Sequence, residues 1–187
     1  MILINTFNSI TTRRSIGIVK DEPVPKEMIE KILTAGASAP SHYRTEPWRF
    51  FVLTGDSRLR LGEVLAEIAS SNPNSLSNPG RAKKMPLRAP VIIAVAAVHS
   101  DRKNVLIKEE YAAVCCAVQN MLLTAHDLGL GAIWRTGAAA YHPKVKDFFK
   151  LPQSSEMVAF LYIGYPENEA KDVKKNSYET YTVWMET

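Results

Sequence analysis

The sequence of 187 residues lacks the features that mark several large classes of protein. Its only cysteines, Cys115 and Cys116, are adjacent, so we expect neither a disulfide between them nor a zinc site, and interpret them as buried small side chains in a reducing compartment. No apolar run reaches the ~18–20 residues that span a bilayer. The net charge of +4, from 23 basic and 19 acidic residues, is too small to indicate nucleic-acid binding, and no motif for it is present. We therefore expect a cytoplasmic protein of one domain that binds neither nucleic acid nor membrane.

The motifs of nucleophilic and metal-dependent hydrolysis are also missing. There is no G-x-S-x-G elbow and no H-E-x-x-H pair. The segment "GLG" at Gly129–Gly131 lacks the third glycine of a dinucleotide fingerprint and follows a predicted helix, not a strand. The histidines are scattered without ligand spacing: His42, His99, His126 and His142. We therefore expect no metal site and nominate no catalytic side chain, and the chemistry would belong to a bound cofactor.

Hydrophobic periodicity predicts the order helix, helix, strand, helix, strand, helix, strand, helix, strand and tail, which is typical of an α+β or mixed α/β domain. The strongest helix covers residues 108–129. Its apolar residues follow the helical period and its other faces are small or apolar, so we expect it to be buried nearly all round, at the centre of the domain or in an oligomer interface. Residues 72–90, with four prolines, indicate a long irregular segment such as a lid. The tail, 166–187, has aromatic residues at its far end and should dock on another surface.

The pair Arg13-Arg14, followed by Ser15, has three interpretations. A twin-arginine export signal needs a long apolar segment after the arginines, and "SIGIV" gives way at once to polar residues, which excludes this interpretation. On these residues alone, the solvated end of a helix over 3–14 is the commoner case, because arginines in a last turn suit the helix dipole. The third interpretation is a clamp for an anion, since planar guanidiniums beside a hydroxyl suit a phosphate.

Two further segments combine polar side chains with small residues beside predicted strands. The segment "ASAPSHYRTEPWRF", residues 37–50, could let a flat ligand approach the backbone and offers Ser38 and His42 beside it. In "GAIWRTG", residues 131–137, glycines bracket a tryptophan and an arginine at a strand end. Each segment alone is equally compatible with an ordinary loop or strand end.

Taken together and in order, five segments resemble the nitroreductase family of flavoproteins, particularly its short bacterial members: "RRSIG", "ILTAGASAPSHYRTEPWRFFVLTG", "RAPVIIAVAA", "GLGAIWRTG" and "FLYIGYP". The resemblance runs from about Phe7 to Gly164. It implies an α+β, nitroreductase-like fold, with a central, mostly antiparallel sheet wrapped by helices. It also implies an intertwined homodimer with FMN at the subunit interface. Residues 1–187 would then form a single FMN-binding domain, whose C-terminal tail, 166–187, packs on the partner subunit.

The resemblance assigns a set of residues to the cofactor: Arg13, Arg14, Ser15, Ser38, His42, Trp134, Arg135 and Thr136. The first three would hold the FMN phosphate and ribityl chain, the next two would contact the same flavin from the other subunit, and the last three would complete the phosphate site or ring edge. Two positions depart from the family pattern. Relatives often carry a basic residue in place of Ser38, for which Arg44 is the alternative donor. Many also carry Gln where Glu46 stands beside the ring.

The activity implied by this resemblance is that of an FMN-dependent NAD(P)H oxidoreductase. NAD(P)H would give a hydride to the flavin and leave, and a nitroaromatic, a quinone or a similar electron-poor acceptor would take its place in a ping-pong cycle. Two alternatives stay open: different redox chemistry on the same fold, such as dehalogenation or flavin breakdown, or a non-catalytic flavin-binding protein. The sequence does not distinguish NADH from NADPH as the electron donor, and it does not identify the physiological electron acceptor. The basic loop from Arg81 to Arg88 lies either near the dinucleotide phosphates or free in solvent.

Overall fold

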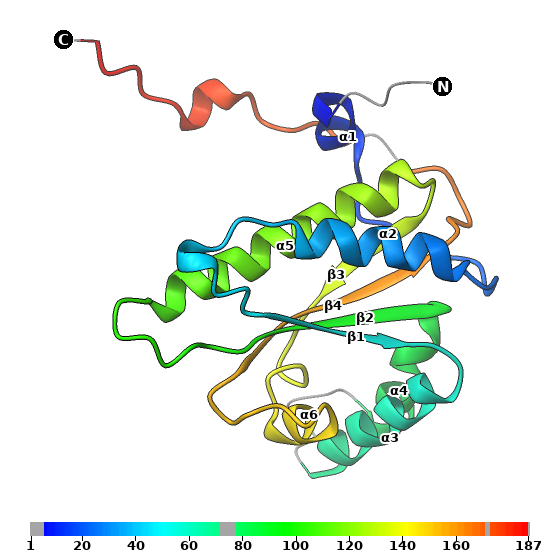
Figure 1. Ribbon diagram of the computed structural model, residues 1–187. Helices are drawn as coiled ribbons and strands as arrows, with labels where there is room; N and C mark the ends of the chain where they lie inside the picture. Colours follow the sequence, from blue (N-terminus) through cyan, green and yellow to red (C-terminus); the bar gives the residue numbers. More distant parts are fainter. Residues whose placement is uncertain (1–5, 72–77, 171–172, 187) are drawn as a thin grey trace.

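A four-stranded antiparallel sheet forms the middle of the molecule (Figure 1). In this computed structural model, which describes residues 6–71, 78–170 and 173–186, the strands are β1 (Trp48–Leu53), β2 (Val91–Ala97), β3 (Gly131–Arg135) and β4 (Glu156–Gly164). Their order is β1-β2-β4-β3, and each neighbouring pair is antiparallel. The predicted α+β class and the mostly antiparallel sheet are confirmed.

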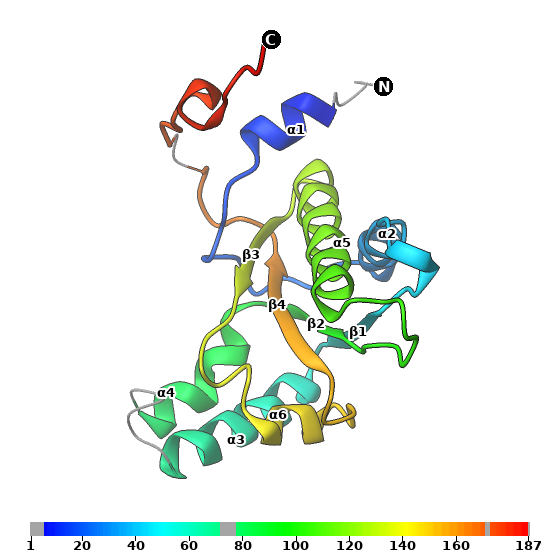
Figure 2. The same ribbon diagram turned by 90° about the vertical axis from the view of Figure 1, so that its left-hand side faces the viewer.

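Helices cover both faces of the sheet, as Figures 1 and 2 show. On one face lie α2 (Lys26–Ala37) and α5 (Ile107–Asp127), and on the other α3 (Asp56–Ser71), α4 (Pro79–Lys84) and α6 (Pro143–Phe148). Each face has its own core. Because side chains of a strand alternate between faces, Ile93 of β2 packs toward α2 and α5, whereas Ile92 packs with α3 and α6. Every residue of β2 is buried, since this strand lies between β1 and β4 under both helical layers.

Helix α5 keeps one exposed face, which departs from the prediction of burial all round. Ala112, Cys116 and Gln119 are exposed, although Val114, Val118 and Met121 are buried against the sheet and α2. The interpretation of both cysteines as buried residues is therefore wrong for Cys116 in the single chain. The expected alternative of an oligomer interface stays a prediction.

The segment predicted to be irregular over 72–90 is largely helical in its described part. Residues 72–77 lie outside the described residues, but Asn78 caps α4, accepting hydrogen bonds from the backbone N–H groups of Gly80 and Arg81, and the 3₁₀ helix η2 (Met85–Arg88) follows. Pro79 and Pro86 stand in the first turns of α4 and η2. Proline is compatible with this position because the backbone N–H groups of a first turn make no hydrogen bond within the helix. Helix α4 packs closely on α3: a Cβ atom added to Gly62 would lie 2.3 Å from the carbonyl oxygen of Lys83.

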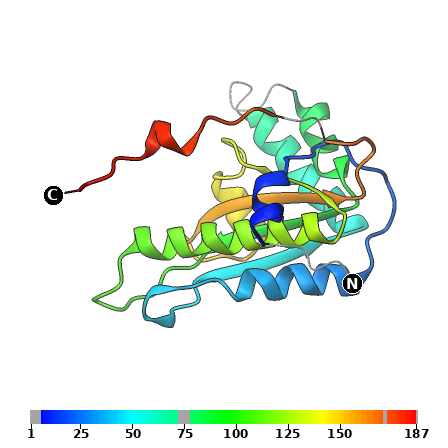
Figure 3. The same ribbon diagram turned by 90° about the horizontal axis from the view of Figure 1, so that it is seen from above.

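The N-terminal helix lies near the C-terminal end of α5, whereas the C-terminal tail extends toward the opposite side of the molecule (Figures 1 and 3). Helix α1 (Thr6–Thr12) ends just before Arg13, whereas the predicted helix reached residue 14. The tail leads away from the sheet and carries the 3₁₀ helix η3 (Tyr178–Tyr181). Its apolar side chains are strongly exposed in the single chain, Trp184 at 75% and Met185 at 94%.

Candidate functional site

The segment that carries Arg13, Arg14 and Ser15 is fixed between α5 and β3. On its N-terminal side, Ser9 Oγ donates to Asp127 Oδ1 at 2.6 Å, at the end of α5. On its C-terminal side, the backbone N–H of Ile16 donates to the carbonyl of Ala132 in β3 at 3.0 Å. The arginines therefore lie at a defined place, along the outer edge of β3.

A cavity of about 540 Å³ opens beside these residues. Arg13, Arg14 and Ser15 line one side, and Asn168 and Lys175 belong to the chain that lines the other. It is open to solvent on the flank of the molecule where the tail departs. One wall offers guanidinium and hydroxyl groups that suit an anion, whereas Glu169 and apolar side chains such as Ile18 and Val173 complete the lining.

The two neighbouring arginines have different surroundings. Arg14 Nη1 donates to the carbonyl of Thr11 at 2.8 Å and to that of Arg13 at 3.1 Å. It thus satisfies backbone acceptors left open at the end of α1. The Arg13 side chain makes no hydrogen bond or ion pair with the described residues of the chain. Arg13 is therefore the arginine whose donors are available to a ligand.

Arg135, at the end of β3, lies next to this segment. A Cβ atom added to Gly17 would stand 3.1 Å from Arg135 Nη2, so the glycine gives the guanidinium room. The guanidinium lies over the Tyr162 ring, 5.4 Å from its centroid, in a cation–π geometry. Burial raises the pKa of the Tyr162 hydroxyl. Nε of Arg135 is buried and has no hydrogen-bond partner among the described residues.

The other two residues of the "WRT" motif have separate environments. The Trp134 indole N–H donates to the carbonyl of Val158 at 3.0 Å, and the ring packs with the core under α2 and α5. Alternation along β3 directs Trp134 and Arg135 to opposite faces of the sheet. Thr136 is exposed and lines a cavity of about 260 Å³ together with Arg135. Trp134 also belongs to the residues that line this cavity, so all three residues of the motif border it.

Ser38 and His42 belong to the loop between α2 and β1, away from the arginines. Ser38 follows the last residue of α2, and its hydroxyl donates to the carbonyl of Thr34 at 2.8 Å. His42 begins the 3₁₀ helix η1 (His42–Arg44), and its Nδ1 lies 2.8 Å from Glu109 Oε2, in the first turn of α5. The ring of His42 also stacks on that of Tyr43, with centroids 4.3 Å apart.

Arg13 and His42 lie at opposite ends of α5. Thr12 Oγ1 is 2.9 Å from His126 Nε2 near the C-terminal end of this helix, whereas His42 contacts Glu109 in its first turn. At a rise of 1.5 Å per residue, Glu109 and His126 are separated by about 25 Å along the helix. One phosphate group cannot contact both ends within a single chain.

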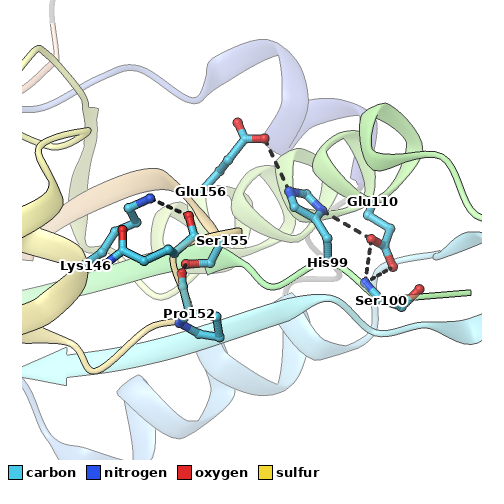
Figure 4. Close-up of polar contacts among 8 residues, drawn as sticks. His99, Ser100, Glu110, Lys146, Pro152, Ser155 and Glu156 are labelled. Carbon is cyan, nitrogen blue, oxygen red and sulfur yellow. Dashed lines mark hydrogen bonds and ion pairs between the residues drawn. The ribbon is translucent and has the colours of Figure 1, made fainter.

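A buried polar cluster that the sequence did not reveal centres on Glu110 and His99 (Figure 4), and Glu110 is the neighbour in α5 of Glu109, which contacts His42. Glu110 is only 2% exposed, and its carboxylate accepts a hydrogen bond from the backbone N–H of Ser100 at 3.0 Å. His99 bridges two carboxylates, with Nδ1 3.2 Å from Glu110 Oε2 and Nε2 3.3 Å from Glu156 Oε1. Burial raises the pKa of Glu110, but the hydrogen bonds from the Ser100 backbone N–H and from His99 lower it by more, so its pKa lies below the ordinary value for a glutamate.

One feature of the sequence, the position of Glu110 in a predicted helix, indicates this cluster. Glu110 stands at the helical spacing of the buried stripe that continues through Ala113, Val114 and Ala117. A carboxylate at such a position must find hydrogen-bond donors, because burying an unpaired charge is costly. The periodicity thus marks Glu110, but it does not identify the donors.

Neither a metal cluster nor a membrane span is found where the structure describes the chain. Within residues 6–71, 78–170 and 173–186, no three His, Cys, Asp or Glu side chains are grouped so that they could hold a metal ion. In the same part of the chain, no helix is both long and apolar enough to cross a bilayer.

Comparison with known proteins identifies the family. The sequence profile of the Nitroreductase family matches residues 10–165. The chain belongs to the nitroreductase family. It is 37% identical over 161 residues to the Escherichia coli K12 protein named "Putative NAD(P)H nitroreductase YdjA", a match that covers 86% of this chain and 88% of the relative. The resemblance found in the sequence is thereby confirmed.

Solved structures of proteins described as nitroreductases or nitroreductase-like support the fold. A nitroreductase-like family protein from Bacillus cereus superposes with a TM-score of 0.85 at 26% identity, covering 100% of this chain and 99% of its own. A structure from Desulfovibrio desulfuricans, described as a nitroreductase in complex with FMN, has a TM-score of 0.71 at 29% identity, covering 97% of this chain and 96% of its own. Membership of this family makes the chain an oxidoreductase, as predicted.

Proposed function

We propose that this chain is an FMN-dependent NAD(P)H oxidoreductase that reduces nitroaromatics, quinones or similar electron-poor acceptors. The observation that carries the proposal is the meeting of the "RRSIG" segment with the end of β3. There Gly17 lies against Arg135, and Arg13 has no partner among the described residues. The likeness to a nitroreductase whose structure is described as an FMN complex supports the same cofactor here.

The residues at this place fit a phosphate-bearing cofactor. Arg13 offers a guanidinium that has no partner among the described residues, and Ser15 adds an exposed hydroxyl next to it. Arg135 has a buried Nε that no described group satisfies, and buried polar atoms in proteins normally have partners. We assign the phosphate to Arg13 and Ser15, with Arg14 holding the end of α1 in place and Arg135 and Thr136 completing the site. Trp134 would act through its packing.

The distance along α5 supports a site built by two subunits. His42 and Ser38 would contact the flavin held by the arginines of the other chain, because the ends of α5 are about 25 Å apart. The exposed face of α5 is suited to such an association, since Ala112 and Cys116 are small and allow close approach. We therefore propose a homodimer in which each flavin lies between the chains.

The tail, 166–187, is proposed to pack on the partner subunit. Its aromatic side chains are exposed in the single chain: Tyr178, Tyr181 and Trp184. Removing aromatic side chains from water is favourable, so these residues would stabilise an interface. The surface between α2 and the edge strand β1 has a cavity of about 670 Å³, with Ile29 and Val52 among its lining residues. A groove of this kind on the partner could receive the end of the tail.

The protein's share of the reaction is to bind and orient. When bound, FMN would supply the redox chemistry, taking a hydride from NAD(P)H and passing electrons to the acceptor in a second half-reaction. Charge-assisted hydrogen bonds from Arg13 and the hydroxyl of Ser15 would fix the phosphate end. The cation of Arg135 adds positive potential to the site. No nucleophile or metal is required of the chain.

A cytoplasmic location is part of the same proposal. Both Cys115 and Cys116 are free thiols, which suits a reducing compartment that also supplies reduced dinucleotides.

The experiment that tests the proposal uses the purified protein and its absorbance spectrum. We expect a bound-flavin spectrum that bleaches when NADH or NADPH is added without oxygen and returns when a nitroaromatic is added. A colourless protein that takes up no FMN would contradict the proposal. A coloured protein that neither dinucleotide bleaches would favour a non-catalytic flavin binder.

A further inference from the structure

The ring of His42 is held by a single carboxylate from another element. Its Nδ1 lies 2.8 Å from Glu109 Oε2, although the two residues are 67 positions apart in the chain. The hydrogen bond from His42 keeps the pKa of Glu109 below 4.5, so this carboxylate is ionised at neutral pH. An ionised carboxylate can only accept, so the hydrogen must be on Nδ1 of the imidazole.

This contact decides which atom of His42 is left for a ligand. With Nδ1–H bound to Glu109, Nε2 is the ring nitrogen that remains for other groups. The His42 side chain is 54% exposed, so Nε2 can be approached from outside the chain. The stacked Tyr43 ring limits the imidazole on one face.

The backbone that follows His42 has an unusual conformation, which contacts with other parts of the chain help to maintain. Tyr43, Arg44 and Glu46 have φ values of 54°, 51° and 47°, in the left-handed region that residues other than glycine seldom adopt. Arg102 Nη1 donates to the carbonyl of Tyr43 at 3.2 Å, which adds a second tie to the segment that precedes α5. The loop is therefore anchored to α5 and to the segment before it at two neighbouring positions.

We propose that Glu109 is a positioning residue, which holds the His42 imidazole with Nε2 directed outward for contact with the flavin of the two-subunit site. This rests on the proposed function, because it takes His42 as a flavin contact. Glu109 itself touches no cofactor in this arrangement. Its effect passes entirely through His42, and this sets it apart from a surface ion pair that only adds to stability.

The test is a double-mutant cycle on FMN affinity. Apo-dimers of the wild type, His42→Ala, Glu109→Ala and the double variant are titrated with FMN, and quenching of flavin fluorescence gives each Kd. We expect His42→Ala to weaken binding about tenfold and Glu109→Ala about threefold to tenfold, the scale of one hydrogen bond. The double variant should match His42→Ala within about a factor of two, because Glu109 acts only through that ring.

A conservative variant and a matched control complete the experiment. Glu109→Gln keeps an oxygen that accepts from Nδ1–H, so its Kd should return to near the wild-type value. Glu67→Ala breaks another exposed ion pair, to Lys144 at 3.0 Å on α6, and should leave the Kd unchanged.

Distinct results would overturn the two ideas. A wild-type dimer that binds no FMN would contradict the proposed function and this inference together. If His42→Ala weakens binding but Glu109→Ala does not, the positioning role alone is wrong. The same holds if the two losses multiply in the double variant, or if Glu109→Gln is as weak as Glu109→Ala.

Discussion

Gly17 and Arg135 lie so close that a Cβ atom on the glycine would stand 3.1 Å from Nη2 of the arginine. The contact joins two motifs that lie far apart in the sequence, since the backbone of "RRSIG" runs past the guanidinium at the end of "GAIWR". The hydrogen bond from Ile16 to Ala132 holds them in this register. The guanidinium thus has a fixed place between the glycine and the Tyr162 ring.

Replacing Gly17 by valine should displace Arg135 and weaken FMN binding by about tenfold, the value of roughly one charge-assisted hydrogen bond. Gly17→Ala is the matched control. Its single methyl group meets the flexible end of the arginine at 3.1 Å and the side chain of Ile133 at ordinary van der Waals distance, so its effect should be small. Titration with FMN measures both variants. Equal affinities for wild type and Gly17→Val would show that the position of Arg135 does not matter for the cofactor.

Replacing Arg13 should mainly reduce FMN affinity, whereas replacing Arg14 should mainly reduce the stability of the fold. Arg13→Ala should weaken FMN binding about tenfold to a hundredfold, because it deletes charge-assisted hydrogen bonds to the phosphate. Arg14→Ala should instead lower the free energy of unfolding by about 1 kcal/mol, through the lost bonds to Thr11 and Arg13 carbonyls, with a smaller change in Kd. Urea unfolding and FMN titration on both variants separate the two roles. The assignment would be reversed if Arg14→Ala cost more affinity than Arg13→Ala.

Removal of residues 173–187 should weaken the dimer at least about a hundredfold, since burial of Trp184 and Met185 contributes about 1.5–3 kcal/mol each. The shortened chain should also lose FMN, because each flavin would lie between two chains. Sedimentation over a range of protein concentrations measures the association. A truncated chain that stays dimeric at the same concentrations would contradict the proposed role of the tail.

Glu110 should make stability depend on pH in the acid range. Its pKa in the folded protein is below 4.5, so its contribution is present above that pH and is lost as the pH falls through the lower, folded-state value. Glu110→Gln should cost about 1–3 kcal/mol at pH 7, because buried donors lose their charged partner. Urea unfolding at pH 7 and below pH 4.5 should show this difference shrinking on acidification. A difference that is the same at both pH values would exclude the charged form as its source.

The elements of the fold could be read from the sequence because their patterns are local. The continuous apolar run of β2 and the helical period of α2 and α5 decide their type and their buried faces. The prolines of residues 72–90 suggest an irregular segment, but Pro79 stands at the start of α4 behind the Asn78 cap, where proline favours a helix. A cap and a proline in first position favour a helix start, and this signal was present.

The site was less accessible to sequence reasoning because it depends on pairings between distant residues. The sequence marked Arg13, Arg14 and Arg135, but only the backbone contacts between Ile16 and β3 bring the two groups together. The difference between Arg13 and Arg14 depends on the end of α1, and the His42–Glu109 pair depends on the packing of the loop on α5. No local pattern contains these contacts.

The two-subunit flavin site is tested most directly by mixing two defective chains. The heterodimer combines an Arg13→Ala chain with a His42→Ala chain. If each flavin site takes Arg13 from one chain and His42 from the other, one of the two sites carries both substitutions and the other site carries neither. Differently tagged chains are co-expressed, the heterodimer is isolated, and its FMN content and affinity are measured. The account predicts one site of wild-type affinity per heterodimer, whereas each homodimer binds weakly. A heterodimer with no such site would show that Arg13 and His42 of the same chain serve the same flavin, and would contradict the account.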